Sequence, residues 1–177
     1  MPANVEIKAR VTDLGAIRSR AVALATAAPE ELEQEDIFFA LPPGAGSAGD
    51  RLKLRSLSAD RGELILYQRA NVPGPKRSNY QLAPTSDPAA LAAILSAVLP
   101  RRATVRKRRT VYHVGQTRVH LDQVVGLGDF VELEVVLRDG QTTDEGAAIA
   151  RELMHRLGID AAELIDRAYV DLLAPET

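Results

Sequence analysis

Charged residues occupy every second position in several short segments of this chain, and this spacing constrains the fold more than any other feature. The clearest segments are residues 4–10, 51–55 and 130–136. In the last of them, Glu132 and Glu134 alternate with valine and leucine. Side chains in a β-strand point alternately to opposite faces. Each segment is therefore predicted to be a strand with one charged face and one apolar face.

The 177 residues suit one domain, predicted to span 1–177 and to contain eight strands and three or four helices. The strands are expected at 4–11, 34–39, 51–57, 63–70, 78–83, 104–114, 117–125 and 129–137. Helices are expected at 14–28, 88–99 and 143–157, and the tail at 160–173 is expected to form a short helix with an apolar end. Capping residues mark the helix starts, and proline or glycine marks their ends.

The turns between strands predict which residues lie opposite one another, and such residues share a face. A two-residue turn at 115–116 sets Arg109 opposite Asp122. An odd-length loop centred on Leu127 sets Asp122 opposite Glu132. One face of these three strands then carries Lys107, Arg109, Arg118, Asp122, Glu132 and Glu134. The loop after Leu57 groups a second set in the same way: Arg51, Lys53, Arg55, Tyr67 and Arg69.

Two arrangements accommodate these charged faces. In a half-exposed sheet they simply meet solvent. However, the charged face recurs in six strands, and the amphipathic helices can cover the apolar faces. We therefore favour an α+β fold in which an eight-stranded antiparallel β-barrel, with flanking helices, encloses a charged and hydrated lumen.

Such a lumen suits a highly charged anion together with a divalent metal ion. Carboxylates two residues apart on a strand lie about 6.6 Å apart, and oxygen ligands suit Mg²⁺ or Mn²⁺ better than zinc. The predicted metal ligands are Glu6, Asp122, Glu132 and Glu134. Arginine and lysine bind phosphate oxygens. The cations predicted to neutralise a chain of phosphates are Lys8, Lys53, Arg55, Arg69, Lys107, Arg109 and Arg118.

Composition argues against other classes of function. A net charge of −2 is unusual for a general nucleic-acid binder, and alternation sends only half of the basic run at 106–109 to each face. The chain has no cysteine for disulfides or thiolate metal sites. It has no apolar run of about 18 residues, so we expect no membrane span and a cytoplasmic location. His113 and His120 stay open between acid–base and structural roles, and the residues do not decide between a monomer and a homodimer.

Several short motifs together resemble the CYTH family of triphosphate tunnel metalloenzymes, and most closely its class IV adenylyl cyclase branch. The 4–8 segment NVEIK is similar to the ExExK opening of the family, and the 34–39 segment QEDIFF is similar to its QxDxYF motif. Further matches follow in family order at 51–55, 64–69, 107–109, 120–122, 126–130 and 132–134.

The resemblance implies an eight-stranded tunnel that binds a triphosphate with Mg²⁺ or Mn²⁺. It assigns Glu6, Glu132 and Glu134 to the metal, with Asp122 as a participant. It adds Arg51 to the phosphate path, beside Lys8, Lys53, Arg55, Arg69, Lys107, Arg109 and Arg118. We expect catalysis to depend on Lys8, Arg55, Arg109 and Asp122. One departure is Asn4, which stands where the opening motif has its first glutamate and brings no charge.

Three functions remain open at this stage. Family members include cyclases that convert ATP into cyclic AMP and hydrolases of thiamine triphosphate or inorganic tripolyphosphate, and both use the same charged lumen. We favour a cyclase because the resemblance is closest to that branch. The alternatives are a triphosphate hydrolase and, motivated by Asn4, a triphosphate or polyphosphate binder without catalytic activity.

Overall fold

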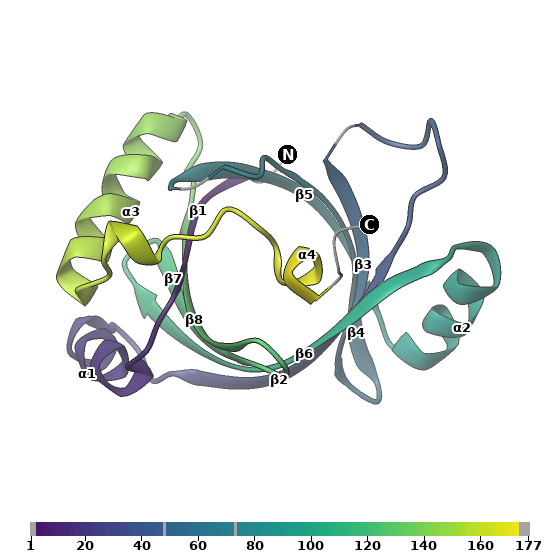
Figure 1. Ribbon diagram of the computed structural model, residues 1–177, viewed down its shortest axis with the longest axis horizontal. Coiled ribbons are helices and arrows are strands. Elements are labelled where there is room, and N and C mark those ends of the chain that lie inside the picture. Colours follow the sequence, from purple (N-terminus) through teal and green to yellow (C-terminus); the bar gives the residue numbers. More distant parts are fainter. Residues whose placement is uncertain (1–2, 48, 73, 174–177) are drawn as a thin grey trace.

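The computed structural model describes residues 3–47, 49–72 and 74–173, and its eight strands form a closed antiparallel barrel (Figure 1). The order around the barrel is β1-β5-β4-β3-β2-β6-β7-β8. The strands are β1 Ala3–Arg10, β2 Glu30–Phe39, β3 Asp50–Ser58, β4 Arg61–Arg69, β5 Lys76–Thr85, β6 Arg101–Val114, β7 Thr117–Val124 and β8 Gly128–Val136. The α-helices are α1 Leu14–Leu24, α2 Pro88–Val98, α3 Thr143–Leu157 and α4 Tyr169–Leu173, and a 3₁₀ turn, η1, spans Ala161–Glu163. The predicted fold class is confirmed.

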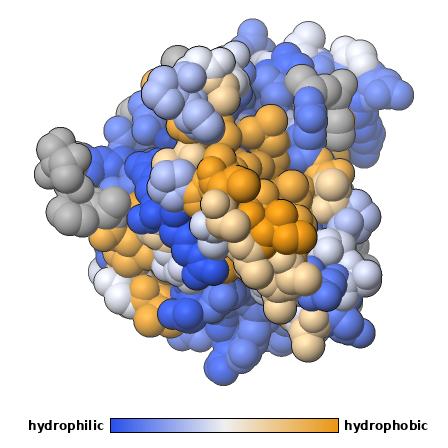
Figure 2. All heavy atoms as spheres, turned by 90° about the vertical axis from the view of Figure 1, so that its right-hand side faces the viewer, coloured by the Kyte–Doolittle hydropathy of each residue, from blue (hydrophilic) through white to orange (hydrophobic). Residues whose placement is uncertain are grey.

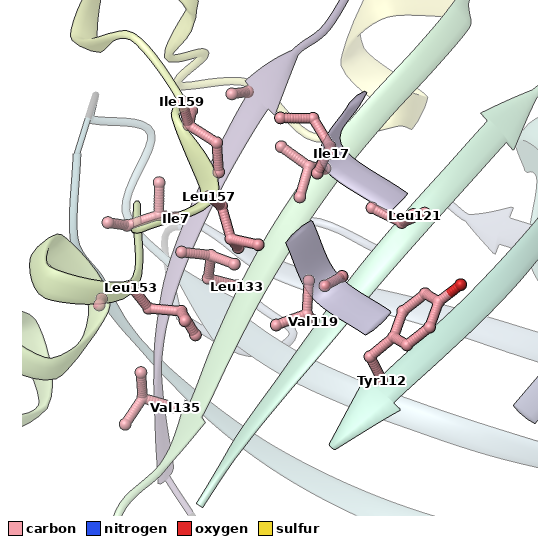
Figure 3. Packing of buried hydrophobic residues seen from close by; sticks show 14 of the residues in the cluster. Ile7, Ile17, Tyr112, Val119, Leu121, Leu133, Val135, Leu153, Leu157 and Ile159 are labelled. Carbon is pink, nitrogen blue, oxygen red and sulfur yellow. The ribbon is translucent and has the colours of Figure 1, made fainter. Parts of the chain in front are cut away.

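The outer face of the barrel beside α1 and α3 carries the largest hydrophobic core (Figure 3). Ile7 of β1 and Leu133 of β8 are almost fully buried there, against Leu153 and Leu157 of α3 and Ile17 of α1. These apolar residues occupy the odd positions of β1 and β8, so the even positions, which carry the charges, point into the barrel. Burial of the apolar face thus fixes the charged face inward.

Two smaller clusters complete the packing. On the opposite outer side, Leu91 and Leu95 of α2 pack against β2, β3 and β4, and Ile94 and Val98 on the far side of the helix stay exposed. Figure 2 shows apolar side chains gathered on this side of the molecule. The third cluster lies at one end of the bore, where Tyr169 and its neighbours in the chain contact Phe130 and other residues that point inward.

The basic run on β6 divides as its alternation predicts. Arg106 and Arg108 lie outside and form exposed ion pairs with Glu35 and Glu33 of β2. Lys107 and Arg109 point inward and are each 6% exposed. The basic run therefore contributes to two separate surfaces. Arg106 and Arg108 lie on the exposed outer surface, and Lys107 and Arg109 face the lumen.

The β6–β7 register is as expected, but the predicted β7–β8 register is wrong by two residues. Asp122 lies opposite Phe130, and His120 lies opposite Glu132. The loop closes around Gly126, whose φ of 78° is a left-handed conformation that glycine adopts easily. Because the shift is even, the charged side chains stay on the predicted face.

The predicted end of the first helix, near Pro29, is also wrong. The helix ends at Leu24, and β2 begins at Glu30, four residues before its predicted start. Residues 30–33 pair with β6, and the amide of Thr26 donates to the carbonyl of His113 at 2.9 Å. Pairing with a long neighbouring strand therefore overrides the local helix signal. None of the helices in the described part of the chain is both long and apolar enough to cross a membrane.

Candidate active site

A cavity of about 430 Å³ lies inside the barrel, within the range of small-molecule sites. All eight strands and Ala168 and Tyr169 contribute to its lining. It is lined by most of the predicted site residues: Glu6, Lys8, Lys53, Arg55, Arg69, Lys107, Arg109, Arg118, Glu132 and Glu134. Arg51 and Asp122 are the predicted site residues that do not line it.

The C-terminal segment, residues 160–173, runs across one end of the barrel (Figure 1), and Ala168 and Tyr169 of this segment line the cavity. The amide of Ile165 donates to the carbonyl of Lys8 at 2.9 Å, and Leu164 forms a bridge with Ala9, so the segment is tied to β1. The ammonium of Lys8 lies 3.6 Å from the ring centroid of Tyr169, a cation–π contact. We call this the closed end and the opposite end the open end.

Asp122 lies beneath the closed end and holds Arg109 in place. The Nε and Nη2 atoms of Arg109 each donate to Asp122 at 2.6 Å, and the hydroxyl of Tyr169 donates to it at 2.8 Å. Burial alone would raise the pKa of Asp122, but Arg109 and Lys107 outweigh it and lower the pKa. Both carboxylate oxygens are thus engaged, and Asp122 is 0% exposed.

A carboxylate wall, made of Glu6, Glu132 and Glu134, runs along β1 and β8. Glu6 lies directly opposite Glu134, and Lys8 lies opposite Glu132. The ammonium of Lys8 contacts Glu132 at 2.6 Å. His120 lies between the two β8 residues, with Nδ1 3.4 Å from Glu132 and Nε2 3.5 Å from Glu134. Neighbouring strands thereby bring together carboxylates that are far apart in the sequence.

Burial in this wall shifts the pKa of Glu6. Burial raises the pKa of Glu6 to about 7, and the negative charges of Glu132 and Glu134 contribute to the rise. Arg69, 3.8 Å away, opposes the shift without cancelling it. A site where a carboxylate is this poorly compensated favours a bound cation.

The residues present fit a hard divalent cation. Asn4 lies on the same wall; its amide nitrogen donates to Glu134, while its Oδ1 is buried without a partner. Among the described residues, no three His, Asp or Glu side chains have the arrangement of a metal site. Glu132 contacts Lys8, and Glu134 contacts Arg118. The amide oxygen of Asn4 would add a further oxygen ligand to these carboxylates, and oxygen ligands suit Mg²⁺ or Mn²⁺.

A cation cluster, made of Lys53, Arg55 and Lys107 around Asp36, faces the lumen from β2, β3 and β6. Asp36 accepts from Lys53 at 2.9 Å and from both Nε and Nη2 of Arg55 at 2.8 and 2.9 Å, and Lys107 lies 3.9 Å away. Burial alone would raise the pKa of Asp36, but the three cations hold it well below its usual range. One buried carboxylate therefore gathers three cations.

Both lysines of the cation cluster carry shifted pKa values. Burial, with the nearby charge of Arg55, lowers the pKa of Lys53 to about 8. Burial and Arg109 hold the pKa of Lys107 well below its usual range. A polyanion in the cavity would reverse both effects by stabilising the charged ammonium forms.

Arg51 and Arg69 stabilise the closed end. Arg51 donates to Asp171 at 2.9 Å and to Asn71 at 2.8 Å, which turns it away from the cavity towards α4. Arg69 lines the cavity and also donates to the carbonyl of Asp166 at 3.4 Å. Arg51 was predicted to line the phosphate path. It contacts the C-terminal segment instead and does not line the cavity.

The open end carries both charged and apolar side chains, because Glu30, Arg61, Glu63, His113 and Arg118 line the cavity there. Leu32, Leu57, Leu82 and Val111 line the cavity there with Tyr80, and Leu82 is 46% exposed. Apolar side chains at the rim of a charged interior suit a ligand that has both a polyanionic part and an organic part.

Sequence reasoning missed two residues of this site, Asp36 and Tyr169. Asp36 lies within the 34–39 motif, but alternation alone does not distinguish an acid that binds a metal from one that gathers cations. Tyr169 lies in a tail whose local sequence does not show that it folds back into the barrel. Its contacts with Asp122 and Lys8 join residues more than 40 positions apart, and no local signal encodes them.

Comparison with known proteins places the chain among relatives of the same architecture. The CYTH domain model matches residues 2–169. Adenylate cyclase CyaB of Aeromonas hydrophila is 29% identical over 94% of this chain and 86% of the relative.

Two solved structures share the fold. The PH1012 protein of Pyrococcus horikoshii superposes with a TM-score of 0.82 at 22% identity, over 97% of this chain and 99% of that one. The Hippeastrum protein HpAC1, described as having a dominant triphosphatase activity, superposes with a TM-score of 0.64 at 16% identity, over 95% of this chain and 91% of that one. With a family model matched over nearly its whole length and a closed barrel that turns its charges inward, this chain belongs to the CYTH family.

Proposed function

We propose that this protein is a divalent-metal-dependent enzyme that converts ATP into cyclic AMP and pyrophosphate. One observation carries the proposal: a single buried cavity sets the carboxylate wall against the cation cluster. Metal ions and fixed cations together stabilise charge on a transferring phosphorus centre, which is the common requirement of phosphoryl-transfer enzymes.

The cations of the lumen bind and orient the triphosphate. Arg55 presents a planar guanidinium fixed by Asp36, and Arg109 presents one fixed by Asp122. Such groups need no reorganisation when negative charge develops on phosphate oxygens, and this lowers the barrier. Lys8, between Glu132 and the ring of Tyr169, is placed to contact phosphate near the closed end.

Mg²⁺ or Mn²⁺ would be held by Glu6 and Glu134 with Asn4, and Glu132 lies close enough to contribute. Bound there, the ion supplies positive charge that neutralises phosphate oxygens. We assign Asp122 a different role from the predicted one, that of a positioning residue for Arg109. Its two oxygens already accept three hydrogen bonds, and it lies outside the cavity lining.

Cyclisation requires the ribose 3′-oxygen to form a bond to the α-phosphorus while the bond to the pyrophosphate oxygen breaks, and the hydroxyl proton passes to solvent. Positioning of the nucleoside therefore decides the reaction. The apolar side chains at the open end, Leu32, Leu57, Leu82 and Val111, support an organic triphosphate over inorganic tripolyphosphate, and the similarity to adenylate cyclase CyaB supports ATP.

Hydrolysis of a triphosphate is the second candidate. The same cavity serves it when an aligned water replaces the ribose hydroxyl as nucleophile. The triphosphatase activity named for the structurally similar Hippeastrum protein supports this alternative.

One experiment separates the candidates. Purified protein is incubated with Mg²⁺ or Mn²⁺ and with ATP, thiamine triphosphate or tripolyphosphate, and the products are identified. Cyclic AMP with pyrophosphate is the expected result, and release of orthophosphate would support the hydrolase. Tight binding of every ligand without turnover would overturn both and leave a triphosphate-binding protein.

A further inference from the structure

Asn4 lies on the carboxylate wall beside Glu6, Glu132 and Glu134. Unlike these three residues, it is polar but uncharged. It is 1% exposed and lines the cavity beside Glu6. Its backbone lies opposite Ser78 of β5 and Val136 of β8, so both neighbouring strands fix its place. The side chain is therefore held in one location, facing the lumen.

The orientation of the Asn4 amide follows from its neighbour. A carboxylate can only accept hydrogen bonds, so the amide atom that faces Glu134 is the nitrogen. The carbonyl oxygen, Oδ1, is then buried and has no hydrogen-bond partner. Leaving such an atom unpaired costs about 1–3 kcal/mol, and a cation coordinated by it would remove this cost.

The charges on this wall match one divalent ion. Glu132 is compensated by Lys8 at 2.6 Å and by Arg109 at 3.7 Å. Among the described residues, the ion pair of Glu6 is with Arg69, at the longer distance of 3.8 Å. Glu134 is paired with Arg118, whose side chain is 37% exposed, and solvent weakens that compensation. The carboxylates of Glu6 and Glu134 thus remain poorly compensated. Their two negative charges would balance the +2 charge of one divalent ion.

We propose that Asn4 Oδ1, Glu6 and Glu134 form a site for a single divalent cation, and that the neutral amide at position 4 limits the empty cavity to that one ion. The inference rests on the proposed function, because it concerns the same metal requirement. A second ion would have to bind beside Lys8 and Arg109 with no carboxylate left to balance it.

Electron paramagnetic resonance of Mn²⁺ tests this directly, because it counts bound ions without any substrate. The native protein is expected to bind one Mn²⁺ per chain. Asn4→Leu, which keeps the side-chain size but removes both polar atoms, is expected to weaken binding at least tenfold. Two ions on the native protein, or unchanged binding in Asn4→Leu, would overturn the inference and leave the proposed enzyme intact. Absence of Mn²⁺ binding would instead overturn the metal requirement of the proposed function and this inference with it.

Asn4→Asp tests the same site in the opposite direction. The new carboxylate replaces a donor to Glu134 with a repelling charge, so the variant is expected to unfold at a lower temperature in chelator and to regain stability with Mn²⁺. Its Mn²⁺ affinity should rise about tenfold. Asn79→Asp is the matched control, because Asn79 lies on the outer face of β5, where its oxygen already accepts from Arg77. Equal behaviour of the two variants in the melting experiment would overturn the assignment of Asn4 as a ligand.

Discussion

The two ends of the cavity are built in different ways. At the closed end, Arg109, Asp122 and Tyr169 are buried and hold one another through hydrogen bonds of 2.6–2.8 Å. At the open end, Leu82 is partly exposed, and the ion pair of Glu30 and His113 faces solvent. Fixed charges suit a polyanion, and the exposed apolar side chains at the open end suit an organic group. Under the proposed function, the closed end would bind the phosphates and the open end would bind the rest of the ligand.

The largest effect is expected from the carboxylate wall. Glu132→Gln combined with Glu134→Gln should lower metal-dependent turnover by about 10³-fold, because it removes charge that binds the ion. The fold should persist, since the change also removes like-charge repulsion. Turnover and circular dichroism are measured beside Glu33→Gln with Glu35→Gln, a matched double variant on the outer face of β2. Normal turnover in the inner double variant would exclude these residues from the metal site.

Asp122→Asn is expected to have the next largest effect. It leaves the buried guanidinium of Arg109 without a charged partner, which should cost about 3–5 kcal/mol of stability. Turnover should fall about 100-fold as Arg109 loses its orientation. Denaturant unfolding and steady-state kinetics measure both quantities.

Glu30→Gln supplies the comparison with the open end. Its exposed pair with His113 should contribute less than about 1 kcal/mol. Equal losses of stability in Glu30→Gln and Asp122→Asn would remove the distinction between the two ends.

The pH dependence of ATP binding should follow the cation cluster. The pKa of Lys53 is lowered to about 8, so its ammonium is present below pH 8 and is lost as the pH rises above it. A ligand that needs this charge should bind more weakly by up to about tenfold per pH unit above 8. Calorimetry from pH 6.5 to 9.5 measures the slope, and subtracting the slope of Lys53→Met removes titration of ATP itself. If ATP affinity changes with pH by the same slope in the native protein and in Lys53→Met, Lys53 does not supply the charge that ATP needs.

The smallest effect is expected at the open end. Leu82→Ala should raise the KM for ATP about threefold to tenfold by removing apolar contact. Binding of tripolyphosphate should not change, because that ligand has no organic part. Val98→Ala, on the exposed side of α2, serves as the control. Equal weakening of ATP and tripolyphosphate by Leu82→Ala would place phosphate, and not the organic group, at this end.

Much of the site could be predicted from alternation because strand geometry is local. Glu132 and Glu134 share a face in any β-strand, and the apolar residues that alternate with them require cover. The β6–β7 register was also predictable, because a two-residue turn leaves little freedom. The β7–β8 register was not, since a glycine-containing loop closes around either Gly126 or Leu127, and the choice depends on the packing of both strands.

The sequence by itself determined which side chains of a strand share the charged face, because the period of a strand is set by covalent geometry. Only the tertiary structure decided that the tail returns to place Tyr169 on Lys8 and Asp122, and that Asp36 gathers three cations where a metal ligand was equally plausible. These contacts join distant parts of the chain, and their stability comes from shared burial inside the closed barrel, which no local pattern records.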